Sequence, residues 1–356
     1  MAFKTAAGYG NLPNGNFSPV IYSKQVQLAF RKSSVVEDVT NNDYFGEIAQ
    51  MGDSVKIIKE PEITVKEYAR GATITPQDID DEDFSLTIDK ANYFAFKIDD
   101  IEEAHSHVNF MQMATDRAGY RLRDQYDQEV LGYLSGFKQS ALNSVAGAVN
   151  DQVNGTKAVT TAGSDELLSS MKLKKGDFGN ITTGSAGDHS IPLAARLPGA
   201  TALPTATASP LMVIARMGRL LDQQLVDTNG RWLVVDPVFI ELLKDEDSRL
   251  LNGDFGGAGI QNGLVVNNLH GFRVYVSNNL PSVGSGASTT GSANQNTNYG
   301  VIVAGHSSAV ATAQQINKTE TYRDPDSFAD IVRGMHLYGR KILRPEGIVT
   351  AKYNAA

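Results

Sequence analysis

One stretch of the sequence constrains the fold more than any other: a strand that runs without a break into a helix of unusual length. In "LTIDKANYFAFKI" the large apolar residues share one phase of a period of two, which predicts a strand with one strongly apolar face: Leu86, Ile88, Phe94, Phe96 and Ile98. Apolar residues then recur at three- and four-residue steps from Asp100 to Leu134. Such a helix would be about 54 Å long, far above the globular average.

The segment before this strand is highly charged. "DSVKIIKEPEITVKEYARGATIT" predicts strands at Val55–Ile58 and Ile63–Tyr68, with a turn at Arg70-Gly71. Its few large apolar residues cannot make a core of their own. A thin hairpin that feeds a long helix needs another chain to lie on, so the sequence indicates a subunit of an assembly.

The remaining elements are predicted with less detail. The first 20 residues indicate an extended arm, and Tyr22 to Asn41 a helix, broken near Ser33-Ser34. Loops with one helix near Asp165 to Met171 fill the region before Pro210, where a helix capped by Ser209 begins.

Beyond this helix the order of elements is mixed. It comprises a strand "RWLVVDP", a helix "VFIELLKDE" capped by Asp236, a strand–turn–strand in "NGLVVNNLHGFRVYVSNNLP", a mobile loop from Ser282 to Asn298, and a strand–helix pair in "YGVIVAGHSSAVATAQQI". The chain then runs as strand, break at Pro345, and strand. The class is α+β.

Composition excludes several classes of protein. A chain of 356 residues with 41% hydrophobic and 20% charged residues is globular, of roughly two domains. It has no cysteine, which excludes disulfides, thiolate nucleophiles and cysteine-bound metals. We expect no membrane partner, because no apolar run approaches about 20 residues and the N-terminus lacks signal-peptide features. The net charge of −8 argues against broad nucleic-acid binding.

Candidate chemical sites are weak. Glu103 and His107 are four residues apart within an acidic stretch, which is metal-ligand spacing, but a solvated acidic helix start is the favoured interpretation. "GDFGGAGIQNG" does not fit a nucleotide loop, and "AGHSSA" lacks the G-x-S-x-G elbow. We therefore predict no catalytic residue, no cofactor and no metal, and a protein that is not an enzyme.

The C-terminal stretch admits two interpretations. In "IVRGMHLYGRKIL" Tyr338 could stack on single-stranded bases, with Arg333, Arg340, Lys341 and Arg344 on phosphates. The same alternation is what a paired strand needs, and we favour the strand.

Several strings, taken in order, resemble the major capsid proteins of tailed bacteriophages with the Hong Kong ninety-seven fold, especially those of short-tailed phages. They are "LTIDKANYFAFKIDDIEEAHS", "RWLVVDPVFIELLKD", "GFRVYVSNNLP" and "FADIVRGMHLYGRKILRPEGIVTA". The resemblance covers roughly residues 20 to 355. It implies an α+β Hong Kong ninety-seven-type capsid fold with an N-terminal arm, an extended β-hairpin loop, a peripheral domain with a long spine helix, and an axial domain.

The resemblance also implies where the domains and segments of the chain begin and end. They are an N-terminal arm at 1–52, an extended loop at 53–85, the peripheral strand and spine helix at 86–137, the axial domain at 138–316, the return to the peripheral sheet at 317–344 and a C-terminal axial strand at 345–356. The terminus would then tie the two domains together.

By the same resemblance, the protein is a structural major capsid protein that forms the hexamers and pentamers of an icosahedral phage head around double-stranded DNA. It would assemble in the host cytoplasm, reside in the virion, and have as partners a separate scaffolding protein, a portal protein and DNA bound by weak nonspecific contact. An encapsulin-like compartment shell is the alternative, and an isolated β-rich enzyme is a third interpretation with little support.

Contacts between subunits would involve the extended loop. In one branch of the family a loop lysine is crosslinked to a neighbour's asparagine, and Lys56, Lys59 and Lys66 are available, although spacing does not select one. An acidic cluster holds Asp80, Asp81 and Glu82 and needs basic partners or screening. The candidates for these contacts are Lys56, Lys59, Lys66, Arg70, Asp80, Asp81, Glu82, Arg333, Arg340 and Arg344.

Overall fold

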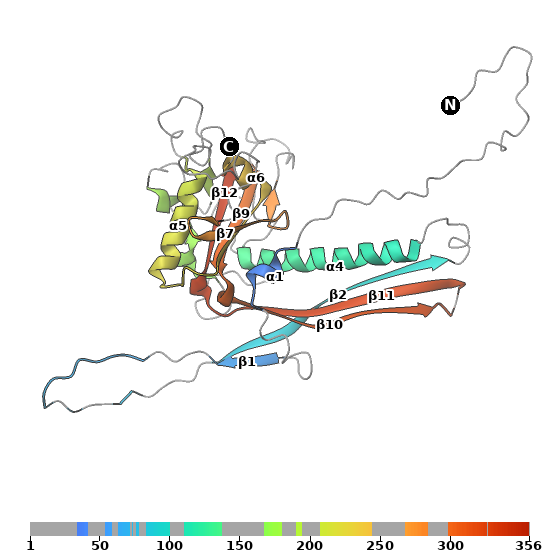
Figure 1. The fold of residues 1–356 in the computed structure, drawn as a ribbon, viewed down its shortest axis with the longest axis horizontal. Helices are drawn as coiled ribbons and strands as arrows, with labels where there is room; N and C mark the ends of the chain where they lie inside the picture. The colour runs from blue at the N-terminus through green and yellow to red at the C-terminus, as the bar shows by residue number, and fades with distance from the viewer. Residues whose placement is uncertain are drawn as a thin grey trace, which may run out of the picture.

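A computed structural model describes thirteen stretches of the chain: residues 34–41, 54–58, 63–71, 73, 76–77, 83–99, 110–136, 167–179, 190–193, 207–243, 268–283, 298–325 and 327–355. Two β-sheets organise them (Figure 1). One is a long four-stranded sheet with a 26-residue helix lying along it, and the other is an eight-stranded sheet with two shorter helices.

The four-stranded sheet is antiparallel throughout, in the order β1-β2-β11-β10. Its strands are β1 (Ser54–Ile58), β2 (Asp83–Asp99), β10 (Val310–Arg323) and β11 (Ala329–Ile342). Helix α4 (Phe110–Ser135) lies against it (Figure 1). The predicted strand is confirmed as β2, and most of the predicted long helix as α4, but the prediction that the apolar residues of β2 share one face is wrong. Residues 100–109, where the helix was expected to begin, lie outside the described part.

A β-bulge in β2 moves its apolar residues from one face of the sheet to the other. Tyr338 pairs with Lys90 and Gly339 with Ile88, so Asp89 has no opposite residue in β11. Beyond the bulge the even-numbered positions face α4. Before it, Leu86 and Ile88 face away from α4 and pack with Ala311, Ala313 and Leu343. A Cβ at position 339 would lie 2.3 Å from the carbonyl oxygen of Thr87, so only glycine fits beside the bulge.

The eight-stranded sheet has the order β3-β12-β9-β5-β7-β6, with β4 beside β12 and β8 beside β9. Its strands are β3 (Lys172–Leu173), β4 (Ser190–Leu193), β5 (Arg231–Val235), β6 (Asn268–Leu269), β7 (Phe272–Val276), β8 (Ser282–Val283), β9 (Asn298–His306) and β12 (Ile348–Ala355). Every residue of β5 is buried. Apart from Arg231, which is paired with Asp222, these residues are apolar, as a central strand covered on both faces requires.

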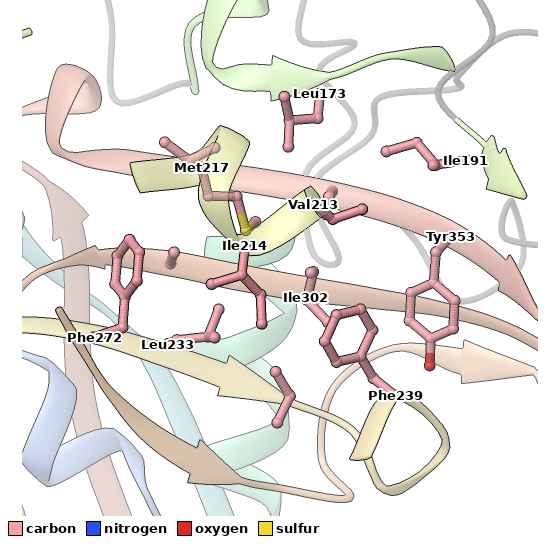
Figure 2. Packing of buried hydrophobic residues seen from close by; sticks show 14 of the residues in the cluster. Leu173, Ile191, Val213, Ile214, Met217, Leu233, Phe239, Phe272, Ile302 and Tyr353 are labelled. Atoms are coloured by element: carbon pink, nitrogen blue, oxygen red, sulfur yellow. The ribbon is translucent and has the colours of Figure 1, made fainter. Parts of the chain in front are cut away.

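Two different layers cover the faces of this sheet. Helices α5 (Pro210–Gln223) and α6 (Pro237–Leu243) cover one face, where Ile214 and Met217 pack near Leu233, Ile302 and other buried residues (Figure 2). The short helix α1 (Val36–Val39) and the C-terminal part of α4 belong to a second core with Trp232, Val234, Val301 and Val303. That core also contains Tyr338 and Ile342 of β11. Helix α4 is therefore packed against both sheets.

The chain passes between the sheets at two adjacent 3-10 turns. Ser307–Ala309 joins β9 to β10, and Pro345–Gly347 joins β11 to β12. The carbonyl oxygen of Ala309 accepts hydrogen bonds from Leu343 N at 2.9 Å and from Arg344 N at 3.2 Å. The predicted order of strand, break at Pro345 and strand is confirmed, and the C-terminal strand does enter a different sheet.

Several predicted elements differ in the structure. Ile63–Tyr68 forms no strand, because these residues have no pairing partner in the described part of the chain and a short hairpin arm is marginal alone. The helix expected before residue 316 is the beginning of β10 instead, since six residues between Val310 and Ile316 pair with β11. The return to the four-stranded sheet therefore begins at Val310 rather than at 317.

Smaller differences concern helix ends. Near Asp165 to Met171, the described residues form a 3-10 turn (Ser169–Met171) rather than a helix. Pro210 does begin α5, but the Ser209 side chain makes no capping bond. Of the helix predicted at Tyr22 to Asn41, the structure describes residues 34–41, where Val36–Val39 form the short helix α1, and Val36 and Val39 are buried together with part of α4. Residues 1–33 and 284–297, which include the first 20 residues and most of the predicted mobile loop, lie outside the described part.

Candidate interaction surfaces and the residues that fix them

The segment at 63–71 exposes large apolar side chains. Ile63, Val65 and Tyr68 are 68%, 93% and 63% exposed. The segment extends away from both sheets, as the blue trace in Figure 1 shows, and Thr64 N donates a hydrogen bond of 3.1 Å to the Gln77 side chain. Apolar side chains presented in this way mark interaction surfaces.

Three of the predicted contact residues lie on or near this segment. Lys66 and Arg70 are exposed within it, and Lys56 is exposed on β1 at its base. Lys59, Asp80, Asp81 and Glu82 lie outside the described residues, as do Glu103 and His107 of the acidic–histidine cluster.

The three predicted contact arginines have different surroundings. Arg333 donates hydrogen bonds of 3.2 and 2.9 Å to Glu320 and lies over the Tyr322 ring. Arg344 is exposed at the crossing between the sheets. The Arg340 side chain is only 5% exposed, with Nη1 3.5 Å from Glu129 of α4. Arg340 is therefore an internal residue of the helix–sheet contact rather than a surface cation.

Tyr338 belongs to the same internal network. It is fully buried, and its hydroxyl donates a hydrogen bond to Glu129 and accepts one of 3.3 Å from Asn92. Its ring meets that of Tyr126 edge to face at 4.8 Å between centroids. Burial, together with the bond to Glu129, raises the pKa of Tyr338 well above the ordinary tyrosine value. A ring held in this way cannot stack on a base, so the strand interpretation of this stretch is confirmed.

Asp127 of α4 joins three parts of the chain. Its Oδ1 accepts hydrogen bonds from Ser34 Oγ at 3.0 Å and from the backbone N–H groups of Val35 and Val36 at 3.0 and 3.1 Å, at the start of α1. Its Oδ2 accepts one of 2.7 Å from Asn279, in the loop after β7. No local sequence pattern predicts this site, because the partners of Asp127 are 91 or more residues away along the chain.

Asp236 fixes the end of the C-terminal strand. Its Oδ1 accepts a hydrogen bond of 3.2 Å from Phe239 N, so the predicted cap of α6 is confirmed. The same carboxylate accepts a hydrogen bond from the Tyr353 hydroxyl of β12. Burial raises the pKa of Asp236, and the bond from Tyr353 opposes that rise.

His306 in "AGHSSA" makes hydrogen bonds that hold two loops together. Its Nδ1 accepts from Ser308 N at 3.2 Å, so Nε2 carries the proton and donates to the Asn229 carbonyl oxygen at 2.8 Å. The ring thereby connects the turn after β9 to the loop before β5. Across the described stretches, no three His, Asp or Glu side chains are grouped to hold a metal ion. No helix among the described residues is long and apolar enough to cross a membrane.

Known proteins provide independent comparisons. A protein-family model described as phage capsid protein matches residues 59–351. No curated protein sequence matches the chain.

Similar solved structures also exist. One from Mycobacterium phage Che8 has a TM-score of 0.65 at 24% identity, covering 95% of this chain and 97% of the other. The capsid structure of the cyanophage P-SCSP1u has a TM-score of 0.60 at 18% identity, covering 96% of this chain and 94% of the other. The mature capsid of bacteriophage PhiM1 has a TM-score of 0.59 at 16% identity, covering 94% of this chain and 91% of the other. At these identities the likeness establishes a shared fold.

Proposed function

Because the chain belongs to the phage capsid protein family, we propose that it is the major subunit of an icosahedral phage head, arranged in hexamers and pentamers around double-stranded DNA. A capsid protein is a structural component of the virion. The proposed role is geometric rather than catalytic: each subunit supplies a rigid body and surfaces that fit its neighbours.

The arrangement of the two sheets supports the finer assignment to the Hong Kong ninety-seven type. We assign the four-stranded sheet to the peripheral domain, with α4 as its spine helix, and the eight-stranded sheet to the axial domain. The order of parts expected from the sequence is retained, but the return from the axial to the peripheral domain is moved to Val310, where β10 begins.

The exposed segment at 63–71 carries this proposal. Its apolar side chains at Ile63, Val65 and Tyr68 are mostly exposed, although each is of a kind that proteins often bury. We infer that this extended loop lies on a neighbouring subunit. Lys56, Lys66, Arg70 and Arg344 are exposed and remain contact candidates, together with Lys59 and the acidic residues Asp80, Asp81 and Glu82.

The partners of assembly follow from the proposed role. We propose a separate scaffolding protein that sets the size of the shell, a portal protein at one vertex and weak nonspecific contact with the packaged DNA. The net charge of −8 suits such contact, because a strongly basic surface would hold the DNA tightly.

Co-expression with a candidate scaffolding protein from the same genome tests this function. We expect closed shells of uniform size in electron micrographs, and capsomers or shells in analytical ultracentrifugation. A protein that stays monomeric with every scaffold tested would contradict the proposal. The encapsulin-like alternative, which the comparisons do not favour, predicts shells that form without a scaffold and enclose a protein cargo.

A further inference from the structure

Leu225 combines two unfavourable features. It lies directly after Gln224, the C-cap of α5, and its side chain is 93% exposed. Its backbone has a φ of 57°, in the left-handed region that a side chain with a Cβ disfavours. Glycine is the usual residue at this position of a helix end. Among the residues that the structure describes, the leucine side chain makes no contact that compensates for this backbone conformation.

The loop around Leu225 is held firmly. Val226 N donates to Leu221 O at 3.1 Å, which closes the end of the helix. The Arg231 side chain, 5% exposed, lies 2.7 Å from the carboxylate of Asp222 and donates to the carbonyl oxygens of Val226 and Asp227 at 2.5 and 2.8 Å. These bonds lie on both sides of Leu225. A strained conformation persists only when its surroundings fix it in this way, and such strain is typical of functional positions.

The other non-glycine residue with a left-handed backbone in the described ranges has a local explanation. His270 has a φ of 50° and is followed by Gly271 with a φ of 82°, in the two-residue turn between β6 and β7. Hairpin turns of this length favour positive φ at both central residues. Leu225 lies in no hairpin, and its exposed apolar side chain has no role in closing the helix.

We propose that Leu225 is a rigid apolar anchor that is buried against a second copy of this chain, at the lateral contact between neighbouring subunits. The proposal rests on the proposed function, which provides neighbouring copies. Helix α5 lies on the side of the eight-stranded sheet toward which the segment at 63–71 extends (Figure 1). A subunit that receives this segment therefore stands on the same side as α5. A side chain held in one position before contact loses little entropy when it is buried, which favours binding.

Three variants test the anchor. Leu225→Gly relieves the backbone strain and removes the apolar side chain. Leu225→Asn keeps a residue that tolerates the left-handed region but makes it polar. His270→Gly is the matched control, because it makes the same backbone change at a position outside the proposed contact. For each variant, the thermal midpoint of the unassembled protein is measured, together with the lowest concentration at which shells form with the scaffolding protein.

We expect Leu225→Gly to raise the thermal midpoint and, at the same time, to raise the concentration needed for shells by about tenfold. Leu225→Asn should show the same assembly defect, and His270→Gly should assemble like the wild type. Assembly of Leu225→Gly at the wild-type concentration would overturn the anchor while leaving the proposed function intact. A lower midpoint for Leu225→Gly would also overturn it, because the strain relieved would then be smaller than the flexibility that glycine adds to the unfolded chain, and Leu225 would not be a strained position. If the wild type forms no shells with any scaffold, the proposed function fails and the anchor fails with it.

Discussion

Asn279 donates a hydrogen bond of 2.7 Å to Oδ2 of Asp127, a carboxylate with no exposed surface. Oδ1 of the same carboxylate binds the start of α1. One side chain of α4 therefore holds the N-terminal segment and the loop after β7 in a fixed relation. Because the carboxylate is buried, its hydrogen bonds are needed to offset the cost of removing it from water.

Asp127→Asn should destabilise the protein. The amide keeps the size of the carboxylate, but its NH2 group must face either the N–H groups of α1 or the NH2 group of Asn279, which are donors already. We expect a loss of about 2–3 kcal/mol in the free energy of unfolding, measured with urea. Asp116→Asn, exposed on the same helix, is the control and should change stability by less than about 0.5 kcal/mol. Equal free energies of unfolding for Asp127→Asn and Asp116→Asn would show that the hydrogen bonds of Asp127 do not stabilise the fold.

Gly334 and Phe94 face each other across β11 and β2, and their substitutions should be coupled. A Cβ at position 334 would lie 2.3 Å from Cε1 of Phe94, so Gly334→Ala must displace the ring at a cost of about 1–3 kcal/mol. Phe94→Ala removes a half-buried ring that stacks on Phe96 at 6.0 Å between centroids. In that background, Gly334→Ala should cost little.

Urea unfolding of the wild type, both single variants and the double variant measures this coupling. We expect a coupling free energy of about 1–3 kcal/mol. Additive effects would mean that the ring does not lie over the glycine.

The sequence predicts correctly those elements whose apolar periodicity and terminal residues indicate the same structure. β2 has one apolar phase, Pro210 marks the start of α5, and the Asp236-Pro237 pair marks the corner between β5 and α6. The beginning of β10 was missed because its small residues, such as Ala311 and Ala313, suit a helix or a strand equally. Only the pairing with β11 decides between the two, and that contact is distant in the sequence.

The interaction surfaces divide in the same way. The many charges and few large apolar residues of the extended loop are visible in the sequence. They predict a loop without a core of its own, and its residues 63–71 are exposed in the structure. The hydrogen bonds of Asp127 and the burial of Arg340 depend on where α4 lies relative to β11, which no local pattern specifies. The strain at Leu225 was equally hidden, because leucine is common near helix ends and its φ has no signature in the sequence.

His336 should make the protein sensitive to mild acid. Burial lowers its pKa below the ordinary value of 6.5. Its ring contacts those of Tyr126 and Tyr338, and its Nε2 lies 3.2 Å from the side-chain oxygen of Gln314. The unfolded chain therefore binds the proton of His336 more readily than the folded protein does. The stability that neutral His336 contributes is complete above pH 6.5, and it is lost as the pH falls through 6.5 toward the lowered pKa of the folded state.

His336→Gln removes this titration. Between pH 7.5 and 5.5, the wild type should lose more stability than the variant, measured as the change in the urea midpoint of each protein. Identical pH dependence of the two proteins would show that His336 keeps an ordinary pKa in the folded state.

Val65 should matter for assembly and hardly at all for folding. It is 93% exposed, so Val65→Ser should change the free energy of unfolding of the unassembled protein by less than about 0.5 kcal/mol. If the segment at 63–71 lies on a neighbour, each subunit would lose about 1.5–3 kcal/mol of apolar burial in the shell. The concentration at which shells form, measured by light scattering with the scaffolding protein, should therefore rise at least tenfold in the variant, as about 1.4 kcal/mol implies. Val65→Ile, which keeps the apolar surface, is the matched control and should assemble like the wild type. If the serine variant forms shells at the wild-type concentration, Val65 stays in water after assembly and this part of the loop does not contact a neighbour.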